Sequence, residues 1–117
     1  MPLPATRDIE FEVTADRTIR GTVHHPPELA GPSPLVVLCH GFKGFKDWGP
    51  WPWFAAELAS RGFVVHRFTF SLAGVGPALD RHDEPDKFAR NTYGAEMEDL
   101  AMVLARREEW AQHQHPS

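Results

Sequence analysis

The stretch most informative about the fold, residues 35–48, reads LVVLCHGFKGFKDW. Its first five residues, Leu35 to Cys39, are all apolar, which is typical of a strand covered on both faces, as in a parallel sheet. His40 and Gly41 end this run, and a loop rich in Gly, Lys and Trp follows. The stretch therefore predicts a buried strand that ends abruptly in a surface loop.

A helix and a second strand are predicted after this loop. Five apolar residues recur at helical spacing and define the expected buried stripe of the helix: Trp51, Phe54, Ala55, Leu58 and Ala59. Gly62 follows at the position of a helix C-cap, and residues 63–70, FVVHRFTF, have the composition of a strand. The order strand, helix, strand predicts a βαβ unit with parallel strands.

The remaining segments predict an antiparallel hairpin and a final helix. Apolar and polar residues alternate in 9–13 and again in 19–23, so a hairpin with one solvent-exposed face is expected. Residues 71–90, rich in Gly, Pro and acids, predict a long irregular loop. Asn91 or Thr92 is expected to cap a helix that reaches about Trp110. Its predicted buried stripe consists of Tyr93, Met97, Leu100 and Leu104.

Length and composition exclude several classes of protein. A chain of 117 residues, 42% hydrophobic and 24% charged, has room for one packed domain. Lys and Arg number 12 against 16 Asp and Glu, so no nucleic-acid partner is expected. No apolar run approaches the roughly 20 residues of a membrane span, and the N-terminus lacks a signal-peptide pattern. With Cys39 as the single cysteine, we expect a cytoplasmic protein without disulfides and without membrane contact.

The string from Leu35 to Trp48, together with the order of elements, resembles the oxyanion loop of α/β-hydrolases. The resemblance is to bacterial members related to dienelactone hydrolases and serine aminopeptidases, and it covers roughly Ile9 to Arg107. It implies an α/β fold class: the N-terminal part of an α/β-hydrolase fold, an antiparallel hairpin followed by β-α-β-loop-α, with an incomplete sheet. Residues 1–117 are then one partial domain that ends before the nucleophile elbow.

The resemblance also implies a serine hydrolase that acts on ester, thioester, amide or lactone bonds and needs no cofactor. The backbone N–H of Phe42 would be one oxyanion donor, in a loop with His40 and with Gly41, which would let the backbone turn sharply and approach the ligand. The nucleophile would lie on a Gly-x-Ser-x-Gly elbow, which none of the serines matches: Ser33, Ser60, Ser71 and Ser117. We therefore expect no activity from this chain alone, and binding of a small-molecule acyl substrate only when a C-terminal half completes the site.

Other candidate residues are assigned structural or solvated roles. His40 precedes a glycine and has no neighbouring nucleophile, so it is expected to be structural, and Cys39 to be buried and inert. Solvation is expected for the charged loop residues Lys43, Lys46 and Asp47. Packing in the core is expected for three tryptophans: Trp48, Trp51 and Trp53.

No metal or phosphate site is predicted. The pairs His24-His25 and His113-x-His115 lack the further ligands of a zinc site, and solvated roles are expected for them. The acidic residues of the long loop lack calcium-loop spacing: Asp80, Asp83, Glu84 and Asp86. Gly74-Val75-Gly76 lacks the remaining residues of a phosphate loop.

The resemblance implies that the strand Leu35 to Cys39 would pair with a strand beyond this chain. In this chain it is then an exposed apolar edge, and we expect self-association through it. Two alternatives to a hydrolase segment remain open. One is a non-catalytic interaction module that adds this edge strand to a partner's sheet, and the other is an incomplete gene product without a function of its own.

Overall fold

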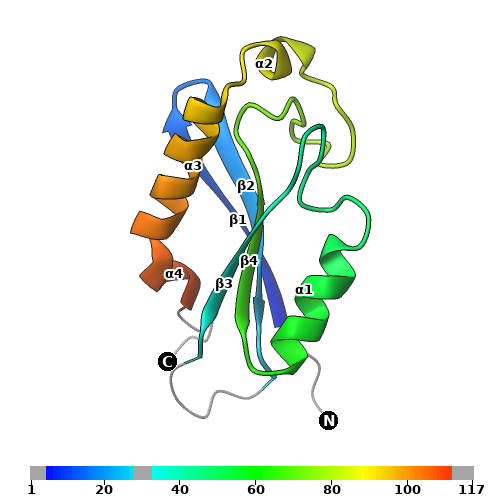
Figure 1. Ribbon diagram of the computed structural model, residues 1–117, viewed down its shortest axis with the longest axis vertical. Helices are drawn as coiled ribbons and strands as arrows, with labels where there is room; N and C mark the ends of the chain where they lie inside the picture. Colours follow the sequence, from blue (N-terminus) through cyan, green and yellow to red (C-terminus); the bar gives the residue numbers. More distant parts are fainter. Residues whose placement is uncertain (1–4, 28–32, 112–117) are drawn as a thin grey trace.

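A computed structural model describes residues 5–27 and 33–111 as one mixed sheet with helices on both sides (Figure 1). The sheet has four strands in the order β1-β2-β4-β3. Their bounds are β1 Ala5–Thr14, β2 Arg17–His25, β3 Leu35–Cys39 and β4 Val64–Thr69. The predicted α/β class with an incomplete sheet is confirmed.

The strand pairing follows the predicted hairpin and βαβ unit. β1 and β2 are antiparallel, β2 and β4 are antiparallel, and β3 runs parallel to β4 with Val37 opposite His66. The expected solvent-exposed face of the hairpin is wrong for β2, because Thr22 and His24 are each only 4% exposed. β2 is paired on both edges, and residues of the loop after β3 cover its second face.

The helices cover both faces of the sheet. Figure 1 shows α1 (Trp51–Ser60) on one side, and α3 (Tyr93–Ala105) and α4 (Arg107–Ala111) on the other. The short helix α2 (Pro85–Ala89) lies within the segment predicted to be irregular, so that prediction is wrong for these residues. Gly62 follows the end of α1 with φ at 103°, which confirms the predicted glycine stop.

The predicted buried stripes of the helices are only partly correct. α1 buries Ala55 and Ala59, but Phe54 is 39% exposed. Thr92 is the N-cap of α3, as predicted, while the helix is interrupted at Arg106 and continues as α4. The predicted stripe of α3 is wrong: the buried residues are Ala95, Asp99 and Val103, whereas three stripe residues are exposed, Tyr93, Met97 and Leu104. A buried polar contact made by Asp99, described below, sets this rotation.

The core lies between the sheet and the α3–α4 side. It contains nine buried residues: Phe11, Ile19, Val23, Val64, Phe68, Phe70, Ala73, Val103 and Trp110. Fully buried His66 packs its ring 4.5 Å from that of Trp110. A Cβ added to Gly21 would lie 2.2 Å from Nε2 of His66, so this close packing requires glycine on β2.

β3 forms one edge of the described sheet, as predicted. Its residues Leu35 to Leu38 are half-buried, and Cys39 is exposed. The expected buried cysteine is therefore wrong, because the second neighbour that would cover an interior strand is absent from this sheet.

Candidate functional site

The segment after β3 begins with His40, whose ring is held in one orientation. Its Nε2 accepts a hydrogen bond from the N–H of Phe70 at 3.1 Å, and its Nδ1 lies 2.8 Å from the carbonyl oxygen of Gly41. Both hydrogen bonds form when the ring is neutral and carries its proton on Nδ1, which then donates to the carbonyl oxygen of Gly41. Burial lowers the pKa of His40, which agrees with that state. This geometry supports a structural role for His40.

Phe42 lies at the tip of this loop, with its side chain 85% exposed. Among the described residues, none accepts a hydrogen bond from the N–H of Phe42. The next residue, Lys43, has φ at 60°, a left-handed conformation that is strained for a residue with a side chain. The loop therefore presents a free backbone donor beside a strained peptide unit.

The sharp backbone turn expected at Gly41 is not seen in its local geometry, while its expected close approach to a ligand stays a prediction. Gly41 does not have a left-handed φ, and a Cβ added to it would meet nothing within 4 Å. Gly44 is the more constrained position: its N–H bonds to the carbonyl of Gly41 at 2.9 Å, and an added Cβ would lie 3.0 Å from that oxygen. The tight turn thus constrains Gly44.

A cavity of about 760 Å³ opens beside this loop. It lies where the end of β3 meets α2 and the start of α3, and its lining is His40, Gly41, Phe42, Phe88, Ala89, Asn91, Thr92, Tyr93 and Glu96. The structure thus brings together all three predicted loop residues, His40, Gly41 and Phe42. The volume is within the roughly 300 to 1,000 Å³ of small-molecule sites.

The far end of the loop carries a buried ionic cluster that sequence reasoning missed. Lys46 was expected to be solvated but is only 5% exposed, and its Nζ donates to Oγ1 of Thr22 at 3.0 Å and to Asp47 at 3.0 and 3.1 Å. The Asp47 carboxylate also pairs with Arg67 of β4. Arg67 and Lys46 lower the pKa of Asp47, although burial opposes them. An arginine within an apolar strand was the sequence signal for such a cluster.

Lys43 is exposed, as expected. Asp47 was also expected to be solvated, but its side chain is only 32% exposed.

A second polar cluster involves Ser71, which lies two residues after the end of β4. Its Oγ donates to Oδ1 of Asp99 and accepts from Nε of Arg17, each at 3.0 Å, and its N–H bonds to Oδ2 of Asp99 at 2.7 Å. Arg17 also bonds to Asp99 at 2.9 Å. Ser71 is thereby engaged in fixing α3 to the sheet, and its geometry is not that of an activated nucleophile.

The histidines of β2 are buried, so their expected solvation is wrong. Nε2 of His24 accepts from Nε of Arg67 at 2.9 Å, and Nε2 of His25 accepts from Nε of Arg7 at 3.3 Å. Burial, with Arg67 nearby, lowers the pKa of His24 to about 4. His113 and His115 lie outside the described residues.

The expected core packing of the tryptophans is wrong for two of them. Trp48 is 53% exposed and Trp53 is 66% exposed, while Trp51 is half-buried. These rings lie on the loop and on α1, where Ala55 and Ala59 instead make the close contact with the sheet.

Asp80 and Asp83 lie in an exposed loop, as expected, whereas Glu84 is half-buried and Asp86 belongs to α2. Asp83 accepts a hydrogen bond from the N–H of Gly76 at 2.8 Å. Within residues 5–27 and 33–111, no group of three or more His, Cys, Asp or Glu side chains is arranged to hold a metal ion. Over the same ranges, no helix has the length and apolar character needed to cross a bilayer.

Two solved structures have folds similar to that of this chain. Brefeldin A esterase, a bacterial homologue of human hormone sensitive lipase, is similar with a TM-score of 0.61 and 20% identity, over 95% of this chain and 30% of the esterase chain. A hypothetical protein from Pseudomonas aeruginosa is similar with a TM-score of 0.50 and 20% identity, over 78% of this chain and 33% of its own. Neither a protein-family model nor a curated protein matches the sequence. The chain thus has the fold of the N-terminal part of an α/β-hydrolase and spans 30 to 33% of these larger chains.

Proposed function

We propose that this chain supplies the oxyanion loop of a serine hydrolase that cleaves an ester, thioester, amide or lactone bond in a small-molecule acyl substrate. The observation that carries the proposal is the free N–H of Phe42 at the rim of the cavity. Negative charge develops on the carbonyl oxygen during acyl transfer, and a preorganised N–H stabilises that charge without reorganising. The esterase named above, whose fold is similar, supports this class of reaction.

The nucleophile, acid and base come, in this proposal, from polypeptide outside residues 1–117. Ser71 is engaged by Asp99 and Arg17, and Ser60 donates to the carbonyl of Glu57 at 2.7 Å. Partial burial, with Glu96 nearby, raises the pKa of Cys39, so its thiol is protonated at neutral pH. Loss of the nucleophile or base costs about a million-fold in rate, which one oxyanion donor cannot offset. We also propose a cytoplasmic location, since one cysteine agrees with a reducing compartment.

The test compares the 117-residue chain with the full-length product of the gene that encodes it. We expect no turnover of p-nitrophenyl butyrate and no fluorophosphonate labelling of the chain alone, and both from the full-length product. In that product, Phe42→Pro removes the N–H and is expected to lower kcat by about 100- to 1,000-fold.

The matched control is Phe42→Leu, which changes the same exposed side chain but keeps the backbone donor. Because the donor is retained, kcat is expected to stay within about threefold of the value for the unsubstituted protein, whereas loss of the donor would cost far more. Equal losses of kcat in the two variants would contradict the role of the N–H. Labelling of the 117-residue chain by the fluorophosphonate would contradict the prediction that this chain lacks a nucleophile.

A second candidate function is an interaction module, and the position of β3 favours it. The strand is unpaired on one side in the described sheet and contains no charged residue or proline to deter pairing. A stable complex with another protein that lacks hydrolase activity would support this candidate over the first.

A further inference from the structure

The loop from His40 to Asp47 is anchored to β4 and the residue after it at both of its ends. At the first end, the His40 ring connects the N–H of Phe70 to the carbonyl of Gly41. At the second end, the N–H of Lys46 donates to Oγ1 of Thr69 at 2.9 Å. The exposed tip lies between these anchors, so its conformation depends on both.

The second anchor depends on one carboxylate. Asp47 lies between the cations of Lys46 and Arg67, whose side chains are only 5% and 10% exposed. Arg67 also donates to the carbonyl oxygen of Lys46 at 3.0 Å, which fixes the loop backbone itself. The other partner of the guanidinium, His24, is neutral at pH 7 because burial lowers its pKa to about 4. Asp47 is therefore the anion that allows two cations to sit together under the loop.

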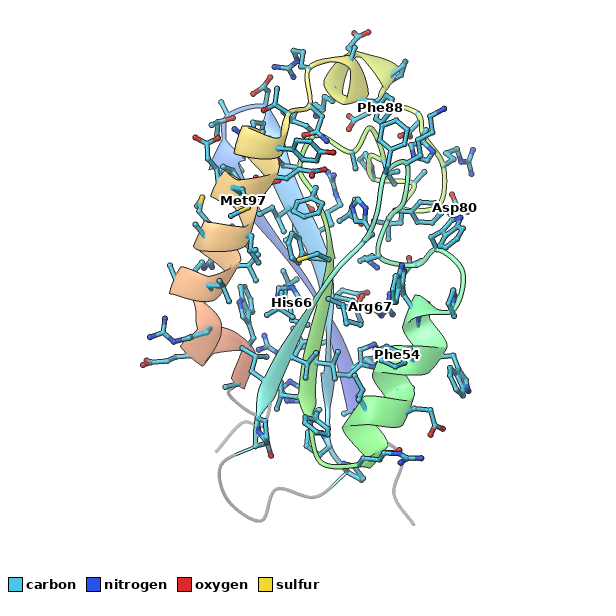
Figure 2. The ribbon with its side chains drawn as sticks, viewed as in Figure 1. Phe54, His66, Arg67, Asp80, Phe88 and Met97 are labelled. Carbon is cyan, nitrogen blue, oxygen red and sulfur yellow. The ribbon has the colours of Figure 1, made fainter. Side chains whose placement is uncertain are left out.

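The side-chain directions explain why this anchor is separate from the core. Figure 2 shows Arg67 and His66 on opposite sides of β4, with Arg67 toward the side of α1 and His66 toward the side of α4. The ionic cluster can be altered without entering the contact between His66 and Trp110. At the loop tip, the left-handed Lys43 is strained, and such strain persists only where the surroundings fix it.

We propose that Asp47 is a positioning residue for the oxyanion loop: by pairing with Lys46 and Arg67, it holds the strained tip so that the N–H of Phe42 remains in place at the cavity. What that N–H binds rests on the proposed function, but the control of the loop by Asp47 does not.

The experiment uses Asp47→Asn, which leaves both cations without an anion. In the 117-residue chain, we expect hydrogen exchange at the amides of Gly44 and Lys46 to accelerate by about 10- to 100-fold, as charge-assisted hydrogen bonds are lost. The amides of β4 are expected to keep their rates. In the full-length product, kcat for p-nitrophenyl butyrate is expected to fall by about 100-fold, the effect of a donor displaced by about 1 Å. KM is expected to change by less than about threefold.

Two variants complete the design. Asp47→Glu restores a carboxylate and is expected to recover most of kcat and of the amide protection. Glu57→Gln removes an exposed carboxylate on α1, 3.9 Å from Arg61, and is expected to change neither quantity. Unchanged loop amides in Asp47→Asn would overturn the proposal, and so would an equal acceleration in β4, which indicates general destabilisation. If the full-length product hydrolyses no ester, the proposed function fails while the exchange data still decide the role of Asp47.

Discussion

Burial lowers the pKa values of three histidines, His24, His40 and His66, and this makes the stability of the protein depend on pH. Burial lowers the pKa of His66 to about 3, and neither ring nitrogen has a hydrogen-bond partner among the described residues. Burial and Arg67 lower the pKa of His24 to about 4. Both values are below the value of about 6.5 expected in the unfolded chain. Protonation below pH 6.5 therefore occurs first in the unfolded state and favours it.

We predict that the free energy of unfolding is not altered by these histidines above pH 6.5 and falls as the pH decreases below it. Each histidine contributes a slope of about 1.4 kcal/mol per pH unit until its folded pKa is reached. Urea titrations at pH 7, 6, 5 and 4.5 measure this slope. His66→Phe, which keeps an aromatic ring in the same place, should remove the contribution of His66 and leave those of His24 and His40. A wild-type protein as stable at pH 5 as at pH 7 would contradict the prediction.

At the scale of an element, α3 combines a local start signal with a rotation set by distant residues. The side chain of Thr92 accepts from the N–H of Ala95 at 3.0 Å and so caps the first turn. Asp99 faces the sheet because Arg17 and Ser71 supply its hydrogen bonds there. The cap is a property of adjacent residues, whereas the buried face depends on β2 and on the end of β4.

Thr92→Ala is predicted to lower the free energy of unfolding by about 1 kcal/mol, since one N–H of the first turn loses its acceptor. Chemical denaturation followed by circular dichroism measures this change. Thr92→Ser keeps a hydroxyl acceptor and serves as the control, with a loss well below that of the alanine variant. A serine variant as unstable as the alanine variant would argue that the cap hydrogen bond is not the cause.

For the whole molecule, the unpaired edge of β3 is the feature with the widest consequence. A charge-free strand that is only half-buried is able to pair with another strand, and a second copy of this chain offers the same edge. We predict that the chain self-associates as its concentration rises, as measured by sedimentation velocity.

Cys39 allows this prediction to be tested without disturbing the core, because it is the exposed residue of β3. Cys39→Lys places a charge at the edge and is expected to shift the population toward monomer. Cys39→Ser keeps the size and neutrality of the side chain, excludes a disulfide as the cause, and is expected to associate like the original chain. A monomer at all concentrations would refute self-association through β3.

Local sequence patterns predicted most of the elements and the composition of the loop. The apolar run before His40, Thr92 as a cap and Gly62 as a stop are signals contained within a few residues, and the structure confirms each of them. The resemblance to α/β-hydrolases singled out His40, Gly41 and Phe42, and these three residues line one cavity in the structure. Local patterns suffice here because strand ends, caps and turns depend on neighbouring residues.

Burial and pairing of polar side chains were decided only by the tertiary structure. Lys46, Asp47 and Arg67 meet because β4 lies beside β2 and beneath the loop, an arrangement that joins residues 21 positions apart. For the same reason, Asp99 rather than the apolar stripe of α3 faces the sheet. The sequence by itself determined the order of the strands and of the longer helices, but neither α2 nor the interruption of the last helix at Arg106. The packing of distant segments determined which charges are buried, because a buried charge is stable only beside partners supplied by other elements.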